Sequence, residues 1–331
     1  MDWDNIKYIV NNYNEINLDY SDLDSIDINV KLNNISLFDN VGQKLIFVEL
    51  RGDTLGKIVD ANTGKLIKRF GRMGRGPGEF VGHYSITADE NGFFIHDIIL
   101  QRGIKFSLSE LLKNKDYFGD KPVFFKSENG SIISMVPHLN SKFVGSGLFK
   151  EGRISFYNEN GEVIGLTGNV PISNIKAPPA IISQAFIGQV AVNPSTHEIA
   201  LATRYSDRIE IYKKTGKKKY ILRGPKNFDP VFEVAQRDGY PALSSNHQMR
   251  IGYVDISVTD KYIYALYNGR TRGESDDSYS GSEIFKFNWE GEVLKLYHLP
   301  FYAGFISVDR NNDNIYLINS SDHNKVYKIN D

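Results

Sequence analysis

Short runs of apolar residues, many alternating with polar ones, recur along the chain about every 50 residues, a spacing typical of strands in repeated β-sheets. The clearest runs are interpreted as the second strand of each repeat, at residues 46–48, 93–95, 143–145, 199–201, 263–265 and 315–317. A third strand is predicted after each of them, at residues 57–59, 103–106, 153–156, 208–211, 283–287 and 325–329. The pattern therefore predicts an all-β protein made of six similar units.

Turn signals complete most of these units. Glycines 64, 161, 216 and 291 stand in short polar hairpins directly after four of the third strands, so each hairpin predicts a fourth strand. The sixth unit stops after its third strand, and residues 25–30 have the alternation needed to supply the missing one. We therefore predict a six-bladed β-propeller of four-stranded antiparallel blades over residues 25–331, with the ring closed by an N-terminal strand in the last blade. Residues 1–24 are predicted to be a polar N-terminal arm, partly disordered or packed along the outside.

One segment carries a family signature. Residues 71–80 read GRMGRGPGEF and are followed by two strands that flank an acid-glycine turn, and Asp97 closes the second of these strands. The segment resembles an NHL-type repeat, and the chain from about residue 25 to 331 is similar to the TolB-like six-bladed propellers of Bacteroidetes. The resemblance implies an extracytoplasmic protein, in the periplasm or on the cell surface as a lipoprotein. It transfers no catalytic residue.

Composition narrows the possible partners. The chain has 331 residues, a formal net charge of -1 and no cysteine. A near-neutral charge gives no general attraction to nucleic acid, and no apolar run approaches the roughly 20 residues of a transmembrane helix. The N-terminus shows no signal peptide. We expect a monomer that binds no nucleic acid.

No motif identifies an enzyme. The chain has no G-x-S-x-G elbow and no H-E-x-x-H pair, so no catalytic residue, metal site or cofactor is predicted. Histidines are scattered at positions 83, 96, 138, 197, 247, 298 and 323, none at a metal-ligand spacing. A saccharide or lactone lyase or hydrolase with its site in the central pocket stays open as an alternative, as does a structural scaffold of an envelope complex.

The arginines point to one face. In an antiparallel propeller, the loops from second to third strands and the connections between blades emerge on the same side, here called the upper face. Ten of the 14 arginines fall in or beside such segments. Arginine offers a rigid fork for carboxylate, sulfate or phosphate. The predicted ligand-binding residues are Arg72, Arg75, Arg102, Arg204 and Arg270, and the predicted partner is an anionic small molecule or saccharide, an acidic peptide, or a protein.

Two further features concern the same face. The arginines could instead brace the loops by pairing with Asp53, Glu79, Asp97 and Asp207, and the sequence leaves this alternative open. Residues 223–249 form a long insertion, predicted to pack over the ligand face with Phe228, Phe232 and Tyr240 as anchors.

Overall fold

The computed structural model describes residues 5–10, 12–52, 54–82, 84–139, 142–170, 176–237, 239–274, 279–311 and 314–331, with Tyr84 described by its backbone alone. Strands dominate this part of the chain. Its α-helices are short, α1 (Leu108–Lys113) and α2 (Pro179–Ala185), and a 3-10 turn covers Tyr20–Asp22. The predicted all-β class is confirmed.

Four antiparallel sheets follow one another along the chain, each with its strands in sequence order. The first holds β4 (Ile35–Val41), β5 (Lys44–Glu49), β6 (Gly56–Asp60) and β7 (Leu66–Phe70). The second holds β10 (Tyr84–Ala88), β11 (Gly92–Asp97), β12 (Arg102–Ser107) and β13 (Val123–Phe124). The third holds β14 (Gly130–His138), β15 (Lys142–Phe149), β16 (Ile154–Tyr157) and β17 (Val163–Thr167). The fourth holds β18 (Gly188–Val192), β19 (Ile199–Thr203), β20 (Arg208–Tyr212) and β21 (Lys218–Arg223).

The remaining large sheet is a composite in two halves. Its order is β24 (Tyr253–Val258), β25 (Tyr262–Tyr267), β26 (Gly281–Asn288), β27 (Val293–Val308), β28 (Asn314–Asn319), β29 (Asp322–Asn330) and β3 (Asp24–Asp27). The long strand β27 is outermost in the first half and innermost in the second. β3 pairs antiparallel with β29, with Ile26 opposite Val326, so a segment from the start of the chain lies beside one from its end.

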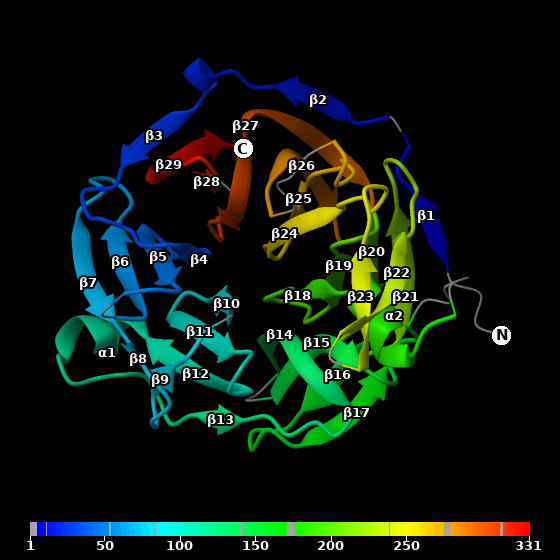
Figure 1. Ribbon diagram of the computed structural model, residues 1–331. Helices are drawn as coiled ribbons and strands as arrows, with labels where there is room; N and C mark the ends of the chain where they lie inside the picture. The colour runs from blue at the N-terminus through cyan, green and yellow to red at the C-terminus, as the bar shows by residue number, and fades with distance from the viewer. Residues whose placement is uncertain are drawn as a thin grey trace.

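The sheets stand around a central opening, with the first strand of each nearest the axis (Figure 1). This arrangement is a β-propeller. The apolar core lies between neighbouring sheets, as the aromatic content of the strands predicts. Phe70 of β7, for example, packs on Phe93 and Phe106 of the second sheet at ring-centroid distances of 5.0 and 5.5 Å.

Side chains of one innermost strand bond the backbone of the next innermost strand around the ring. The N–H groups of Ala88, Met135, Val190, Ile306 and Val308 donate to Asp39, Ser85, Ser134, Asp255 and Ser257, at 2.8 to 3.1 Å. Ser307 of β27 in turn donates its hydroxyl to Asp39 of β4 at 2.7 Å. We call this set the inner brace. It provides hydrogen-bond partners for backbone N–H groups of the innermost strands, which have a neighbouring strand on one side only.

The N-terminal arm lies along the outside of the ring (Figure 1). β1 (Ile6–Tyr8) adds to β21, and β2 (Asn14–Asn17) adds to β27, both in parallel. Ile9 and Tyr13 pack against the core between the fourth sheet and the composite sheet. The arm thus covers two outer sheet edges.

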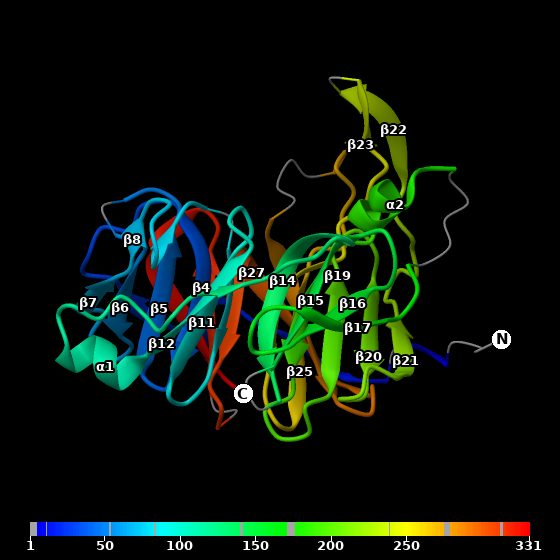
Figure 2. The ribbon, with the colours of Figure 1, turned by 90° about the horizontal axis from the view of Figure 1, so that it is seen from below.

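Two small two-stranded sheets are not part of the large sheets. β8 (Arg72–Met73) and β9 (Glu79–Phe80) fold the glycine-rich segment into a loop, in which Glu79 accepts the N–H of Gly76 at 2.8 Å. β22 (Phe232–Arg237) and β23 (Tyr240–Ser245) form a hairpin that rises above the upper face beside α2 (Figure 2). Phe232 is buried at its base, whereas Tyr240 is 76% exposed. The prediction that Tyr240 anchors this insertion is wrong, because the hairpin stands away from the ring at that end.

Asp331 joins the two halves of the composite sheet. Its side-chain carboxylate accepts hydrogen bonds from Lys286, Tyr264 and Tyr297, and from Lys295 at 2.9 Å. Burial alone would raise the pKa of this carboxyl, but the four donors outweigh burial and hold the pKa well below its usual range. The interaction therefore stabilises the fold at neutral pH and weakens only in strong acid.

We expect Asp331→Asn to lower the free energy of unfolding at pH 7 by about 3 kcal/mol, because it leaves the buried ammonium of Lys286 without its counter-charge. Urea unfolding followed by circular dichroism measures the change. Asp27→Asn is the control, since Asp27 pairs with Lys325 on the surface at 3.7 Å and surface pairs contribute little. Equal stability of the two variants would contradict the role of Asp331.

Removing residues 1–31 deletes β3 and exposes the edge of β29, so we expect loss of cooperative melting or oligomer formation. Removing residues 1–20 deletes β1 and β2 but keeps β3, so we expect a lower melting temperature with a single transition. Calorimetry and light scattering distinguish the two results. If the longer truncation melts like the full chain, β3 is dispensable.

Candidate functional site: an arginine cluster on the upper face

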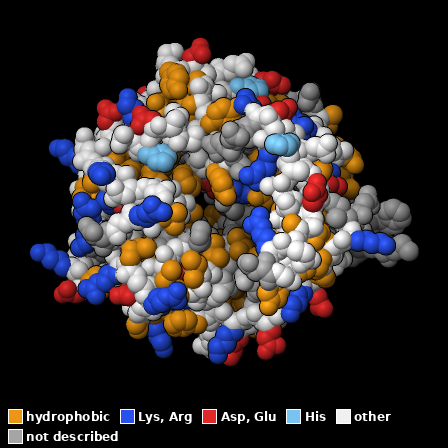
Figure 3. Space-filling view, in the orientation of Figure 1, with side chains coloured by type: hydrophobic (Ala, Val, Ile, Leu, Met, Phe, Trp, Pro, Cys, Tyr) orange, Lys and Arg blue, Asp and Glu red, His pale blue; other side chains and the backbone are white. Residues whose placement is uncertain are grey.

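The upper face is seen in Figure 3, where Lys and Arg side chains gather beside the central opening next to β18 and β24. This group comes from two second-to-third-strand turns and from the connections before and after the β22–β23 hairpin. Its members are Arg204, Lys226, Arg250, Arg270 and Arg272. We call it the arginine cluster.

The backbone holds two members of the cluster on neighbouring loops. Gly252 donates its N–H to the carbonyl of Arg204 at 2.6 Å, and Ile251 donates to the carbonyl of Arg270 at 2.8 Å. A Cβ at position 252 would lie 2.2 Å from the carbonyl oxygen of Ser206, so only glycine fits there. The segment of residues 251–252 therefore ties both arginine loops together.

Each of these two arginines lies over a tyrosine ring. The guanidinium carbon of Arg204 is 4.9 Å from the ring centroid of Tyr279, and that of Arg270 is 4.7 Å from Tyr302. Tyr279 is 69% exposed. Stacking orients a guanidinium through its face, and the planar fork of N–H groups at its edge is the part that recognises an anion.

The rest of the cluster is held by local contacts. Arg250 and Lys226 donate to the carbonyl of Gly269 at 2.6 and 2.8 Å, and Arg272 donates to Ser245 at 3.0 Å. Arg250 also lies 3.7 Å from the carboxylate of Glu274, a half-exposed pair. The carboxylates of Glu283 and Asp255 also interact with Lys226, Arg270 and Arg204, so the described part of the cluster holds five cationic side chains and three acids.

Arg102, Arg72 and Arg75 lie elsewhere. Arg102 begins β12, is 3% exposed, and finds no partner for its Nε and Nη2 atoms among the described residues. Burial lowers the pKa of its guanidinium, although Asp97 and Glu79 oppose the shift. Arg72 stacks on Phe118 at 3.7 Å, and Arg75 is exposed in the same segment between β8 and β9. Of the five predicted residues, the structure brings together Arg204 and Arg270.

The acids proposed as bracing partners bond mainly to backbone. Asp97 accepts the N–H of Val81 at 2.7 Å, and Asp207 accepts that of Phe228 at 3.1 Å. Glu79 caps its own loop, as described above. In the parts of the chain that are described, Asp97, Asp207 and Glu79 form no ion pair with an arginine; Asp53 lies outside them.

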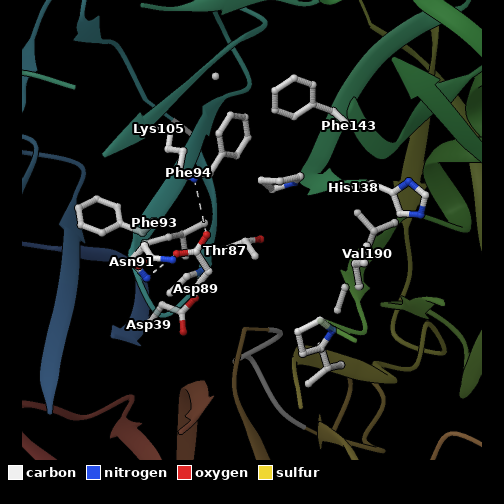
Figure 4. Close-up of a pocket in the computed structure, with 18 of the residues that line it drawn as sticks. Asp39, Thr87, Asp89, Asn91, Phe93, Phe94, Lys105, His138, Phe143 and Val190 are labelled. Carbon is white, nitrogen blue, oxygen red and sulfur yellow. Dashed lines mark hydrogen bonds and ion pairs between the residues drawn. The ribbon is translucent and has the colours of Figure 1, made fainter. Parts of the chain in front are cut away.

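A cavity opens on the opposite face, at the turns that join first to second strands. It has a volume of about 600 Å³ and runs from the axis outward between the second and third sheets (Figure 4). Phe94 and Phe143 lie against each other in its wall at 5.2 Å. Lysines 105, 121 and 142 line it together with the acids Asp39, Asp89 and Asp120. Charges of both signs give it no preference for one type of ion. Sequence reasoning missed this cavity because its lining comes from several separate sheets.

Asp39 of β4 and Asp255 of β24 are carboxylates on innermost strands. Burial raises the pKa of both, that of Asp255 to about 7, and Asp39 adds to the shift of Asp255. Both accept backbone N–H groups of the inner brace. These hydrogen bonds give both carboxylates a structural role, which accounts for their burial without a role in acid-base catalysis.

Among the described histidines, His138 and His197 lie together in the wall of the cavity, with ring centroids 6.1 Å apart. His96 is buried without a hydrogen-bond partner, and burial lowers its pKa to about 3. His138 places Nε2 3.2 Å from the carbonyl of His197. Across the described residues no group of three or more His, Asp and Glu side chains could hold a metal ion, and His83 lies outside that part of the chain.

The comparisons with known proteins agree with the fold. The family model described as TolB-like 6-blade propeller-like matches residues 34–327, so the chain belongs to this family. No curated protein matches the chain in sequence. No described helix is long and apolar enough to cross a membrane.

Three solved structures are similar in fold. A predicted exported protein of Bacteroides fragilis has a TM-score of 0.57 at 9% identity, covering 98% of this chain and 99% of its own. A DUF4221 family member from Bacteroides vulgatus has a TM-score of 0.60 at 11% identity, covering 93% and 95%. The β-propeller domain of Cps50 (Swd1) from Myceliophteria thermophila has a TM-score of 0.50 at 11% identity, covering 92% and 99%. Identities this low establish the propeller fold alone.

The raised pKa of Asp255 predicts a pH effect on stability. Between about pH 4, where an unfolded Asp titrates, and pH 7, the folded carboxyl binds more protons than the unfolded one. Stability from this group is therefore present in acid and falls as the pH rises through that window. We expect the difference in unfolding free energy between the wild type and Asp255→Asn to fall by up to about 1.4 kcal/mol per pH unit. Urea titrations at four pH values test this, and a flat difference would contradict it.

Proposed function

We propose that the protein is a binding propeller whose arginine cluster recognises an acidic ligand on the upper face. The observation that carries this proposal is the pair Arg204 and Arg270, which start from loops tied by one backbone segment and lie over tyrosine rings. Bidentate, charge-assisted hydrogen bonds from arginine are the strongest polar contacts available for a carboxylate or a sulfate.

An anionic saccharide fits this site better than an acidic peptide. Tyr279 and Tyr302 bring aromatic surface beside the charged groups, and a sugar ring offers an apolar face as well as its acidic substituent. Arg72 and Arg75 would extend the same basic character to the rim, while Arg102 would act from below the surface. An acidic peptide remains the competing outcome of the test.

The enzyme alternative has less support. A lyase or hydrolase in the central pocket would need acid-base groups free to act on a substrate. The axial carboxylates Asp39 and Asp255 are already engaged by backbone N–H groups. A scaffold role in an envelope complex would use the exposed hairpin tip at Tyr240 rather than the arginine cluster.

The proposed architecture is six four-stranded blades in a ring closed by β3. The pairing of β3 with β29 supports it, as does the bond from Ser307 to Asp39 between the last and first sheets. We also propose an extracytoplasmic location, supported by the exported description of the Bacteroides fragilis protein with the same fold.

The test is direct binding of uronic-acid oligosaccharides, sulfated oligosaccharides and an acidic peptide, measured by calorimetry at several salt concentrations. We expect salt-sensitive binding of the uronic-acid or sulfated saccharides. The double variant Arg204→Gln with Arg270→Gln should weaken binding by at least about 100-fold, because each charged hydrogen-bonding group contributes roughly 1.5 to 3 kcal/mol.

The control removes equal charge elsewhere: Lys213→Gln with Lys214→Gln, on a hairpin of the opposite face. This control should bind like the wild type, and both double variants should keep the wild-type melting temperature. Undiminished binding by the arginine variant would exclude the cluster as the site. A large loss of melting temperature would show that these arginines hold the loops instead.

A further inference from the structure

The cavity on the face opposite the arginine cluster is large enough for a small molecule, and the proposed function does not use it. Its volume of about 600 Å³ lies within the range of about 300 to 1,000 Å³ found for ligand pockets. Apolar side chains and charged groups of both signs line it, and they come from separate sheets. A ligand that fits this lining has an apolar body and carries charges of both signs.

Two phenylalanines form an apolar wall of the cavity between the second and third sheets (Figure 4). The rings of Phe94 and Phe143 lie 5.2 Å apart at an angle of 34°, and Phe143 also packs edge-on against Phe125 at 5.1 Å. A Cβ at Gly103 would lie 2.0 Å from the ring of Phe94, so glycine there lets this ring lie over β12. Aromatic rings pack on one another at centroid distances of about 4.5 to 7 Å. The wall therefore offers a fixed surface for a further ring.

A pair of opposite charges stands beside this wall (Figure 4). Lys105 lies directly opposite Phe94 in the β11–β12 ladder, and its Nζ is 3.8 Å from Oδ2 of Asp89. At that distance the two groups attract each other but share no hydrogen bond. The side chains of the pair are 51% and 40% exposed, whereas Phe94 and Phe143 are 3% and 9% exposed. The cavity is thus polar where it meets solvent and apolar at its wall.

Both charged groups keep hydrogen-bonding capacity for a ligand. Asp89 uses Oδ1 to accept the N–H groups of Asn91 and Gly92 at 2.7 and 2.9 Å, which fixes the carboxylate and leaves Oδ2 without a hydrogen bond from the described residues. Within the same part of the chain, Nζ of Lys105 donates no hydrogen bond. An exposed ion pair contributes little to stability, so a ligand can come between its members at small cost.

We propose that this part of the cavity binds an aromatic α-amino acid as its zwitterion. Its ring packs on the wall of Phe94 and Phe143, its ammonium donates to Asp89, and its carboxylate accepts from Lys105. One carbon holds the ammonium and the carboxylate of an α-amino acid, so they can meet two protein groups that are 3.8 Å apart. Each contact is a charge-assisted hydrogen bond. A ligand with a single charge would part the ion pair and leave one of its members without a partner.

Isothermal titration calorimetry with L-phenylalanine tests the class of ligand. We expect a dissociation constant of about 1 mM or below. Binding should be at least about tenfold weaker for 3-phenylpropionate, phenethylamine and L-alanine, which lack the ammonium, the carboxylate and the ring. No binding of L-phenylalanine at about 10 mM, or equal binding of any of these analogues, would overturn the proposal.

Variants of the charged pair locate the site. Asp89→Asn keeps an oxygen for the N–H groups of Asn91 and Gly92 but loses the charge, so the turn is retained while the ammonium contact is weakened. Asp89→Asn and Lys105→Gln should each raise the dissociation constant of L-phenylalanine at least about tenfold at an unchanged melting temperature. Lys115→Gln, at an exposed position outside the cavity lining, is the matched control and should bind like the wild type. Wild-type affinity in either cavity variant, or equal weakening by the control, would also overturn the proposal.

Discussion

The structure depends on how it satisfies the innermost edge of each sheet. A strand beside the axis has a neighbour on one side only, and its remaining N–H groups would otherwise face a narrow channel. The inner brace provides partners from serine hydroxyls and two aspartates, most of which accept a backbone N–H of the next innermost strand. These bonds set the spacing of the sheets at the axis, and the apolar contacts farther out fill the space that this spacing leaves.

Side chains that accept backbone N–H groups of another segment also hold the loops of the upper face. Asp97, at the end of β11, and Asp207, directly before β20, accept N–H groups from the connections between sheets. The loops are therefore held by backbone hydrogen bonds, and the arginines are not needed for that purpose at these acids. Because Asp97 and Asp207 bond to backbone N–H groups, we favour Arg204 and Arg270 as the residues that contact a ligand.

The outermost strands also have unpaired backbone groups along one edge, and these edges are protected in other ways. Charged residues protect one edge, and the N-terminal arm covers two others with short parallel strands. β17 (Val163–Thr167) carries no charge, and its pairing with β16 is interrupted by a bulge at Ile164.

Much of the fold could be predicted from local signals in the sequence. The repeated strands and the glycine hairpins depend on alternation and turn chemistry, which neighbouring residues determine, and the strands of the sheets lie where these signals predicted them. Residues 25–30 were predicted to supply a strand, and β3 covers Asp24–Asp27. The arm strands β1 and β2 were not found, because a three- or four-residue strand has no periodicity of its own and becomes a strand only against β21 or β27.

The candidate site was predicted only in part. Sequence alone determined that arginines concentrate in the loops of one face, because strand direction alternates along the chain. Only the tertiary structure decided that Arg102 is buried, that Arg72 lies at the rim, and that Gly252 ties the loops of Arg204 and Arg270. It also decided that a large cavity lies on the opposite face. Distances between loops of different sheets depend on how the sheets pack around the axis, and no local pattern of residues encodes that.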